Sequence, residues 1–116
     1  MTGTSNLVDE KLEQIQDKLE FEYGDVTPAS TPVRSDVFEY HKYGKVIQVV
    51  LVNLRMSGTG QVQLGTIPYK PNRMVYFWGW DINNNPMRFG IDIGGKIYCY
   101  TNADSLMYGN CTYIIP

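Results

Sequence analysis

The sequence predicts an all-β domain, an antiparallel β-barrel or sandwich, that follows a short N-terminal coiled-coil helix. Three observations predict this fold. From residue 36 onward, apolar residues alternate or run continuously over strand-length segments, with turn residues roughly every ten positions and no helical period. In residues 8–19, apolar residues recur at spacings of four, three and four, which is typical of a coiled coil. Acidic residues are concentrated in residues 1–33, whereas nearly all aromatic residues lie after them.

Residues 1–23 are predicted to form a coiled-coil stem. Four apolar residues occupy its a and d positions: Val8, Leu12, Ile15 and Leu19. Charged and amide side chains fill most of the other positions, so the helix would carry a narrow apolar stripe on a charged surface. Two heptads are too short to associate alone in water. We therefore expect an oligomeric stem that needs the following domain to assemble, with a helix packed on its own domain as the alternative.

Residues 24–35 are predicted to be an extended linker between the stem and the β domain. They contain Gly24, Pro28, Pro32 and several Ser and Thr residues, but few apolar residues. Residues 36–116 then form the β domain. Its main expected strands are the segments 37–41, 46–54, 61–67, 74–80, 87–93, 96–101 and 111–115.

The longest expected strand, Val46 to Leu54, is β-branched and apolar on both faces. Such a strand needs two surfaces to cover it. One surface is the core of a barrel, and the other is either a neighbouring subunit or the second layer around a central sandwich strand. The strand therefore agrees with the oligomer interpretation of the stem without requiring it.

Composition and charge exclude several classes of function. The net charge is −2 with no basic block, so nucleic acid is not expected as a partner. No apolar run of about 18 residues and no secretory signal pattern occur, so membrane insertion is not expected. The sequence has no phosphate-binding loop or zinc-ligand spacing, so we expect neither cofactor nor metal. Cys99 and Cys111, on consecutive expected strands, are predicted to be buried free thiols, with a disulfide as the alternative.

Catalysis is not expected either. The single histidine, His41, lies near a turn and has no nucleophile that the sequence pairs with it. The β domain has few carboxylates: Asp36, Glu39, Asp81, Asp92 and Asp104. A glycosidase needs two of them across a groove, and Asp92 with Asp81 or Asp104 would be the candidates. A glycan-cleaving enzyme therefore stays a less favoured alternative.

The densest aromatic run, residues 74–81, suggests a carbohydrate site. Tyr76, Trp78 and Trp80 share one face of the expected strand, while Phe77 belongs to the core face. Aromatic faces pack on sugar rings, and Asp, Asn and Arg side chains bond sugar hydroxyls. The candidate saccharide-binding residues are Trp80, Arg88, Asp92, Tyr100, Asn102 and Tyr108. The alternative is a solvated face whose tyrosines lie at a subunit interface.

Short motifs of the β domain resemble known phage proteins. The segments 43–46 and 64–68, followed by a proline, resemble C-terminal domains of phage tail fibres and baseplate proteins. The segments 88–93, 97–100 and 109–113 resemble the receptor-binding head domain of lactococcal siphophage baseplates. This resemblance covers residues 37–116.

The resemblance implies a fold, a function and an assembly. These phage proteins are homotrimers with a stem and a β-barrel head, and the head binds saccharides of the host cell wall near the subunit interfaces. The chain would then be made in the host cytoplasm and lie at the tail tip of the virion. Its N-terminus would join other baseplate or tail proteins. The predicted stem fits this plan.

The binding residues of that family match this sequence only in part. The family pattern is similar to Phe-His-Ile-Asp, then a Trp after the hairpin and an Arg near the C-terminus. Asp92 matches the Asp, Gly90 stands where the His would be, and Tyr100 falls at the Trp position. Tyr108 falls near the Arg position. Arg88, at another position of the sequence, is a candidate to supply the guanidinium instead. A different host glycan, or a different cleft lined by the tryptophans, is equally allowed.

We therefore expect a tail-tip receptor-binding protein that binds host-surface saccharide without catalysis. The main alternative is a structural adaptor of the baseplate, whose aromatic surface would bury against a protein partner. The two hypotheses differ in whether the exposed aromatic residues form a concave pocket or a flat face.

Overall fold

A computed structural model describes residues 21–116, which form a single antiparallel sheet. Its nine strands are β1 (Phe21–Asp25), β2 (Thr27–Pro28), β3 (Arg34–Tyr43), β4 (Val46–Arg55), β5 (Val62–Thr66), β6 (Val75–Asp81), β7 (Pro86–Ile91), β8 (Lys96–Cys99) and β9 (Met107–Ile114). Their order across the sheet is β1-β3-β4-β9-β6-β7-β8-β5-β2. The residues predicted to form the stem, Val8, Leu12, Ile15 and Leu19, lie outside the described residues. No helix in residues 21–116 is long and apolar enough to cross a membrane.

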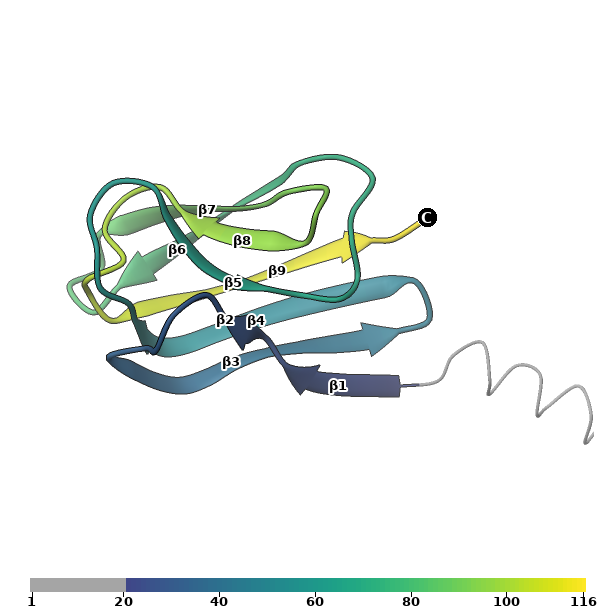
Figure 1. Cartoon of the computed structure of the whole chain (residues 1–116), viewed down its shortest axis with the longest axis horizontal. Coiled ribbons are helices and arrows are strands. Elements are labelled where there is room, and N and C mark those ends of the chain that lie inside the picture. Colours follow the sequence, from purple (N-terminus) through teal and green to yellow (C-terminus); the bar gives the residue numbers. More distant parts are fainter. Residues whose placement is uncertain (1–20) are drawn as a thin grey trace, which may run out of the picture.

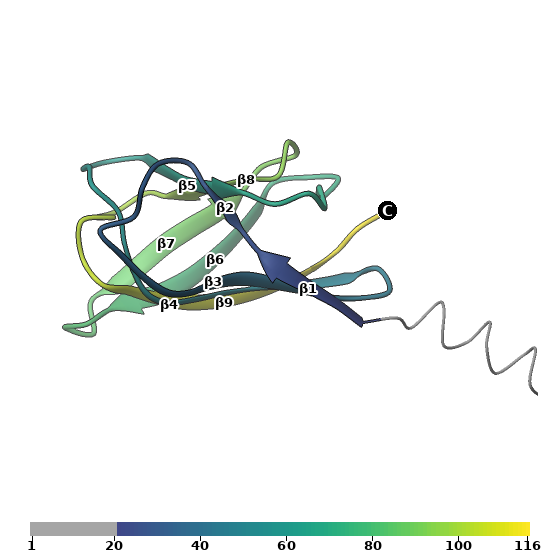
Figure 2. The same ribbon diagram turned by 60° about the horizontal axis from the view of Figure 1, so that its bottom comes forward.

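The sheet curls into a nearly closed barrel, because its two end strands are consecutive in the chain (Figures 1 and 2). We call residues 21–29 the closing segment. Its first half pairs with β3, where the Val26 N–H also donates to the Phe38 carbonyl at 2.9 Å. Its second half pairs with β5, where the Ala29 N–H donates to the Leu64 carbonyl at 3.0 Å. One segment therefore bridges the two edges that an open sheet would expose to other chains.

The structure differs from the predicted boundaries at this segment. The predicted stem ends at residue 23 and the predicted linker at residue 35, but these positions fall inside β1 and β3. Residues 24–35 include the end of β1, all of β2 and the start of β3 rather than a free linker. The physical reason is burial: Val26 is 2% exposed and packs in the core. At Gly24 a Cβ would lie 2.8 Å from the Tyr40 hydroxyl, so glycine lets the two strands approach.

The core lies inside the barrel and follows the alternation that the sequence predicts. Phe77 of β6 and Met87, Phe89 and Ile91 of β7 are buried, and the Phe77 and Phe89 rings stack with centroids 5.0 Å apart. Ile93, which continues the apolar alternation of β7, is instead 66% exposed. It lies beyond the strand, in the turn to β8, where a side chain no longer faces the core.

Both cysteines are buried and free, as the sequence predicts. Cys99 lies on β8 and Cys111 on β9. The prediction placed them on consecutive strands that are possible neighbours. In the sheet, β6 and β7 separate β8 from β9, so these two strands are not paired.

Strand β4 is the long apolar strand that the sequence predicts to be covered on two sides. Its inward residues Ile47, Val49 and Leu51 are fully buried, while Val50 and Val52 on the outer face are half-buried. The strand pairs with β3 on one side and with β9 on the other, so both of its edges are hydrogen-bonded within the sheet. Coverage of its outer face by a neighbouring subunit stays a prediction.

Candidate functional site

The outer surface of strands β6–β9 carries the aromatic residues that the sequence singled out. Tyr76, Trp78 and Trp80 project outward from β6 and are 55%, 65% and 47% exposed. The paired strands β7, β8 and β9 add further outward side chains next to this row. We call this surface the aromatic face: Tyr76, Trp78, Trp80, Arg88, Tyr98, Tyr100 and Tyr108. Single exposed apolar residues are ordinary, but a contiguous patch of them marks a binding surface.

One half of the aromatic face is a cluster around Arg88, which lies opposite Trp78 in the strand pairing. The Arg88 guanidinium carbon is 4.5 Å from the Tyr76 ring centroid and 5.6 Å from that of Tyr100. The Tyr100 ring also lies 6.1 Å from Tyr76 and 6.3 Å from Tyr98. We call Tyr76, Arg88, Tyr98 and Tyr100 the tyrosine–arginine cluster. The aromatic faces hold the cation in place by their quadrupoles.

Gly90 lies between Tyr76 and Tyr98 in the strand register and makes room for this cluster. A Cβ at Gly90 would be 2.8 Å from the Met74 methyl and 2.9 Å from the Tyr100 ring. Tyr100 therefore lies across β7 in the space that any larger residue at position 90 would fill.

Asp92 follows β7 and holds the turn to β8. Its Oδ1 accepts hydrogen bonds from the backbone N–H groups of Gly94 and Lys96, both at 2.9 Å. Its Oδ2 accepts the Tyr98 hydroxyl at 3.3 Å. Burial, with the nearby Asp92 charge, raises the pKa of Tyr98, so this hydroxyl remains a donor at neutral pH. Asp92 therefore stabilises the hairpin and orients one tyrosine of the cluster, and its contact with a ligand stays a prediction.

The other half of the aromatic face is formed by Trp80 and Tyr108. Their rings stack at 6.2 Å with an interplanar angle of 10° across β6 and β9. They border a shallow groove of about 110 Å³ on the outer side of β4, β9 and β6. Its lining residues are Val50, Leu51, Val52, Trp80, Tyr108, Gly109 and Asn110. The groove is small beside ligand sites of roughly 300–1,000 Å³.

The Tyr108 hydroxyl is already engaged within the domain. It donates to the Asn53 Oδ1, and the Asn53 amide donates in turn to the Asp36 Oδ2 at 2.8 Å. Arg34 binds both oxygens of Asp36, at 3.1 and 2.8 Å, and this hydrogen-bonding lowers the pKa of Asp36. Asn53 has a φ of 49° at an irregularity of β4, which turns its side chain toward both partners. The ring of Tyr108, rather than its hydroxyl, is thus the part available to a ligand.

Asn102 lies in neither half of the aromatic face. It follows β8, and its Oδ1 accepts the backbone N–H of Asp104 at 3.2 Å. Asp104 forms an ion pair with Arg55 at 2.8 Å. The structure therefore gives Asn102 a local turn contact, and a role in binding stays a prediction.

Three aromatic residues lie on the aromatic face although they were not among the predicted site residues. Tyr76 and Trp78 share the outward row of β6 with Trp80, and Tyr98 lies across β7 from Tyr76. Their outward direction follows from the alternation, which the sequence shows. Their proximity to Arg88 follows from strand pairing and register, which no local pattern specifies.

A second exposed aromatic cluster lies on β1 and β3, at the other end of the sheet order. The Phe21 ring stacks on Tyr23 at 5.7 Å and lies 4.8 Å from Tyr43. His41 is half-buried beside Phe21 and Tyr23, and its Nε2 lies 2.9 Å from the Glu39 carboxylate. The histidine therefore belongs to a packed surface cluster and contacts Glu39 by a hydrogen bond.

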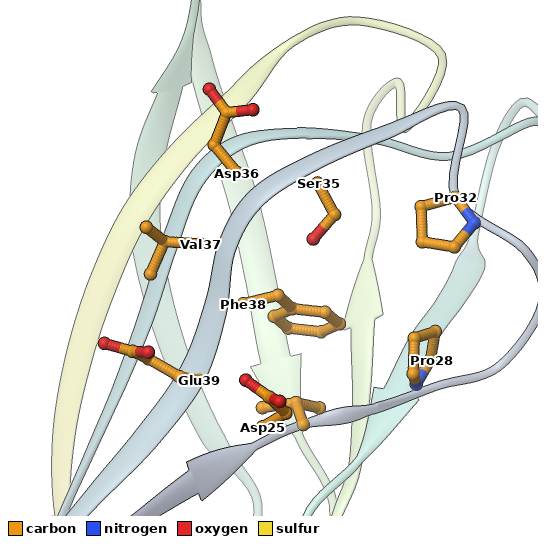
Figure 3. A pocket seen from close by; sticks show the side chains of 9 residues that line it. Asp25, Pro28, Pro32, Ser35, Asp36, Val37, Phe38 and Glu39 are labelled. Carbon is orange, nitrogen blue, oxygen red and sulfur yellow. The ribbon is translucent and has the colours of Figure 1, made fainter.

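A larger cavity, of about 350 Å³, lies between the closing segment and β3. Figure 3 shows the Phe38 ring on the side of β3 that faces the closing segment, toward Pro28, with Val37 on the opposite side. Asp25 and Glu39, which are register partners, also line this cavity. The sequence did not predict this cavity, because it exists only where the closing segment joins the two edges of the sheet.

The five carboxylates considered for catalysis each have a partner. Asp36, Glu39 and Asp104 contact basic side chains, while Asp92 holds its turn. The Asp81 Oδ1 accepts the backbone N–H groups of Asn83 and Asn85, and the hydrogen bonds from Asn85 lower the pKa of Asp81. Within residues 21–116, no three His, Cys, Asp or Glu side chains are placed to hold a metal ion.

Comparison with known proteins supports the fold. No family model and no curated protein matches the sequence. Among solved structures, the chain is similar to the crystal structure of the receptor binding protein (gp15) of Listeria phage PSA. The TM-score is 0.60 over 93% of this chain and 78% of that chain, at 15% sequence identity. The fold is similar to that of a phage receptor-binding protein. The resemblance to lactococcal baseplate heads in particular stays a prediction.

Proposed function

We propose that this chain is a phage tail protein whose β-barrel domain binds saccharide on the host cell surface without catalysis. The observation that carries the proposal is the aromatic face, on which Tyr76, Trp78 and Trp80 lie exposed in one row. The likeness to a phage receptor-binding protein supports it. The proposed location is the tail tip of the virion, with the N-terminus joined to other baseplate or tail proteins.

The aromatic face offers both kinds of contact that a sugar needs. The Trp78 and Trp80 rings supply flat apolar surfaces for the C–H faces of sugar rings. Arg88 and the Tyr100 hydroxyl supply donors for hydroxyl or acidic groups on the sugar, whereas the Tyr98 hydroxyl donates to Asp92 and offers only an acceptor. Because the groove beside Trp80 is shallow, we expect a single domain to bind weakly.

A homotrimer would compensate for weak binding through avidity. Three linked heads, repeated in many copies on a tail, convert later binding events into intramolecular ones and strengthen adhesion without new contacts. The a/d pattern of Val8, Leu12, Ile15 and Leu19 supports a trimeric stem. Light scattering on the full chain at micromolar concentration tests this: a trimer mass is expected, and a clean monomer contradicts it.

Tryptophan fluorescence tests saccharide binding directly, because the only two tryptophans of the chain lie on the aromatic face. The full chain is titrated with purified cell-wall polysaccharide from a panel of bacteria, and binding is confirmed by calorimetry. Trp78→Ala is expected to weaken binding about tenfold, as for a central aromatic contact. The matched control is Tyr43→Ala, which removes a 52% exposed ring from the other aromatic cluster. The absence of binding to every polysaccharide contradicts the proposal.

The shallow groove favours a second candidate function, that of a structural adaptor. A flat aromatic face of this kind also fits a protein partner, since Trp, Tyr and Arg dominate the centres of protein interfaces. The same variants separate the two functions. An adaptor loses assembly with other tail proteins when Trp78 is replaced, and the wild-type chain binds no polysaccharide.

A further inference from the structure

We infer that the tyrosine–arginine cluster recognises an acidic substituent, a carboxylate or a phosphate, on the saccharide. This inference rests on the proposed function, because it concerns the same face. It adds the chemical class of the ligand, which the proposed function leaves open. Arg88 is the residue that carries it.

The charge of Arg88 has no carboxylate partner within residues 21–116. Arg34 forms an ion pair with Asp36, and Arg55 forms one with Asp104, whereas Arg88 forms none in this part of the chain. Its contacts are with the Tyr76 and Tyr100 rings. Aromatic rings attract a cation but do not neutralise it, and they accept none of the hydrogen bonds that a guanidinium offers at its edges.

The next carboxylate along the chain, Asp92, forms hydrogen bonds with other groups. Asp92 lies four residues after Arg88, just beyond the end of β7, which corresponds to about 13 Å for an extended chain. Its carboxylate accepts hydrogen bonds from Gly94, Lys96 and Tyr98. Among the described residues, Arg88 therefore forms no direct ion pair, and its charged edge is available to an acidic group beside the aromatic rings.

The cluster also holds Arg88 in place before any ligand arrives. The Tyr100 ring lies against Arg88 because Gly90 leaves room for it, and the Tyr98 hydroxyl is tied to Asp92. A long side chain held in this way loses little freedom on binding. A planar guanidinium matches the two oxygens of a carboxylate or phosphate with paired hydrogen bonds, which a hydroxyl of a neutral sugar does not reproduce.

The test compares native and neutralised forms of the same polysaccharide. The probe is the wall polysaccharide that the full chain binds in the fluorescence experiment, used native, after chemical reduction of its carboxyl groups, and after removal of its phosphate groups. We expect one of the two treatments to weaken wild-type binding at least tenfold, which identifies the acidic group. Raising the salt concentration is expected to weaken binding to the native form only, since it screens charge.

Variants of Arg88 test whether this residue causes the preference for the acidic form of the polysaccharide. Arg88→Gln is expected to bind native and neutralised polysaccharide with equal affinity, whereas Arg88→Lys keeps part of the preference because it keeps the charge. Because Arg88 is exposed, both variants are expected to fold, and circular dichroism checks this. Trp78→Ala serves as the control, since it is expected to weaken binding to both forms alike.

Two outcomes overturn the inference in distinguishable ways. If neither treatment changes wild-type affinity, or if Arg88→Gln keeps the full preference, the acidic ligand is wrong while saccharide binding stands. If no polysaccharide binds in any form, the proposed function fails and the inference fails with it.

Discussion

The two faces of strand β6 both carry aromatic residues but differ in how far these residues are exposed. On its inner face, Phe77 is 7% exposed and stacks on Phe89 in the core. On its outer face, Trp78 is 65% exposed although tryptophan is among the most apolar residues. Burial accounts for the inner residues, because each removes apolar surface from water. Burial gives no such explanation for the exposed aromatic residues of the outer face. The difference in exposure therefore distinguishes the residues that form the core of the barrel from those that are available for binding.

Glycines show the same contrast between the two faces. Gly79 and Gly109 oppose each other on the inner face, beside the Phe89 ring. Gly90 faces outward and makes room for Tyr100. On the inner face, the absence of a side chain at Gly79 leaves space for the Phe89 ring. On the outer face, its absence at Gly90 leaves space for the Tyr100 ring.

The largest expected difference between the faces is in stability. Phe89→Ala removes a fully buried ring and is expected to lower the free energy of unfolding by about 3–5 kcal/mol. Trp78→Ala is expected to change it by less than about 0.5 kcal/mol, since the ring is on the surface. Denaturant titrations of both variants measure this contrast. A loss of several kcal/mol in Trp78→Ala would mean that the aromatic face supports the fold.

A pair of glycine variants tests the packing under Phe89. In Gly79→Ala, the new Cβ would lie 2.1 Å from the Tyr108 carbonyl oxygen, so β6 and β9 have to separate. We expect a destabilisation of about 1–3 kcal/mol. In Gly109→Ala the nearest atom, on the Phe89 ring, is 3.5 Å away, an ordinary contact. Gly109→Ala is expected to be neutral or slightly stabilising, because alanine restricts the unfolded chain. Equal thermal stabilities of the two variants would contradict this packing.

The inner and outer tyrosines are expected to differ by one hydrogen bond. The Tyr113 hydroxyl, on a 5% exposed side chain, donates to the Tyr69 carbonyl at 2.6 Å. Tyr113→Phe is expected to cost about 0.5–1.5 kcal/mol, as for a typical internal hydrogen bond. Tyr76→Phe, on the outer face, is expected to leave the free energy of unfolding unchanged. Urea titrations measure both, and similar losses would show that the Tyr76 hydroxyl also has a structural partner.

Much of the barrel was predictable because its strands alternate in the sequence. The opposite directions of Phe77 and Trp78 follow from the two-residue period of a strand, as does the outward direction of Arg88. The all-β class was predictable for the same reason. These features depend only on neighbouring residues.

The features that the sequence did not predict depend on distant partners. Residues 24–35 look like a linker because prolines and polar residues dominate them, yet Val26 is buried between segments that the sequence does not place beside it. The prediction that Asp92 binds a ligand is untested, but the two turn hydrogen bonds of Asp92 were not predicted, because they depend on the backbone conformation after β7. The gathering of Tyr76, Arg88 and Tyr100 needs the register of β6, β7 and β8. Register is a property of the folded sheet rather than of any one segment.

The smallest expected effect concerns acid stability, to which the turn held by Asp81 contributes. The hydrogen bonds from Asn85 lower the pKa of Asp81 in the folded chain below its value in the unfolded chain, near 4. The unfolded chain therefore takes up a proton first as the pH falls. The stability that Asp81 contributes is complete above that pKa and is lost as the pH falls through the lower folded pKa.

Asp81→Asn isolates this contribution because it removes the titrating group and keeps an amide oxygen as an acceptor. We expect the urea midpoint of the wild-type chain to fall as the pH is lowered from about 4. We expect the midpoint of the variant to fall less over the same range. Because Asp36 also has a lowered pKa, through Arg34, the variant keeps part of the decline. Parallel curves for the two proteins would mean that the Asp81 turn holds its carboxylate no better when folded than when unfolded, and that acid sensitivity arises from the outer ion pairs alone.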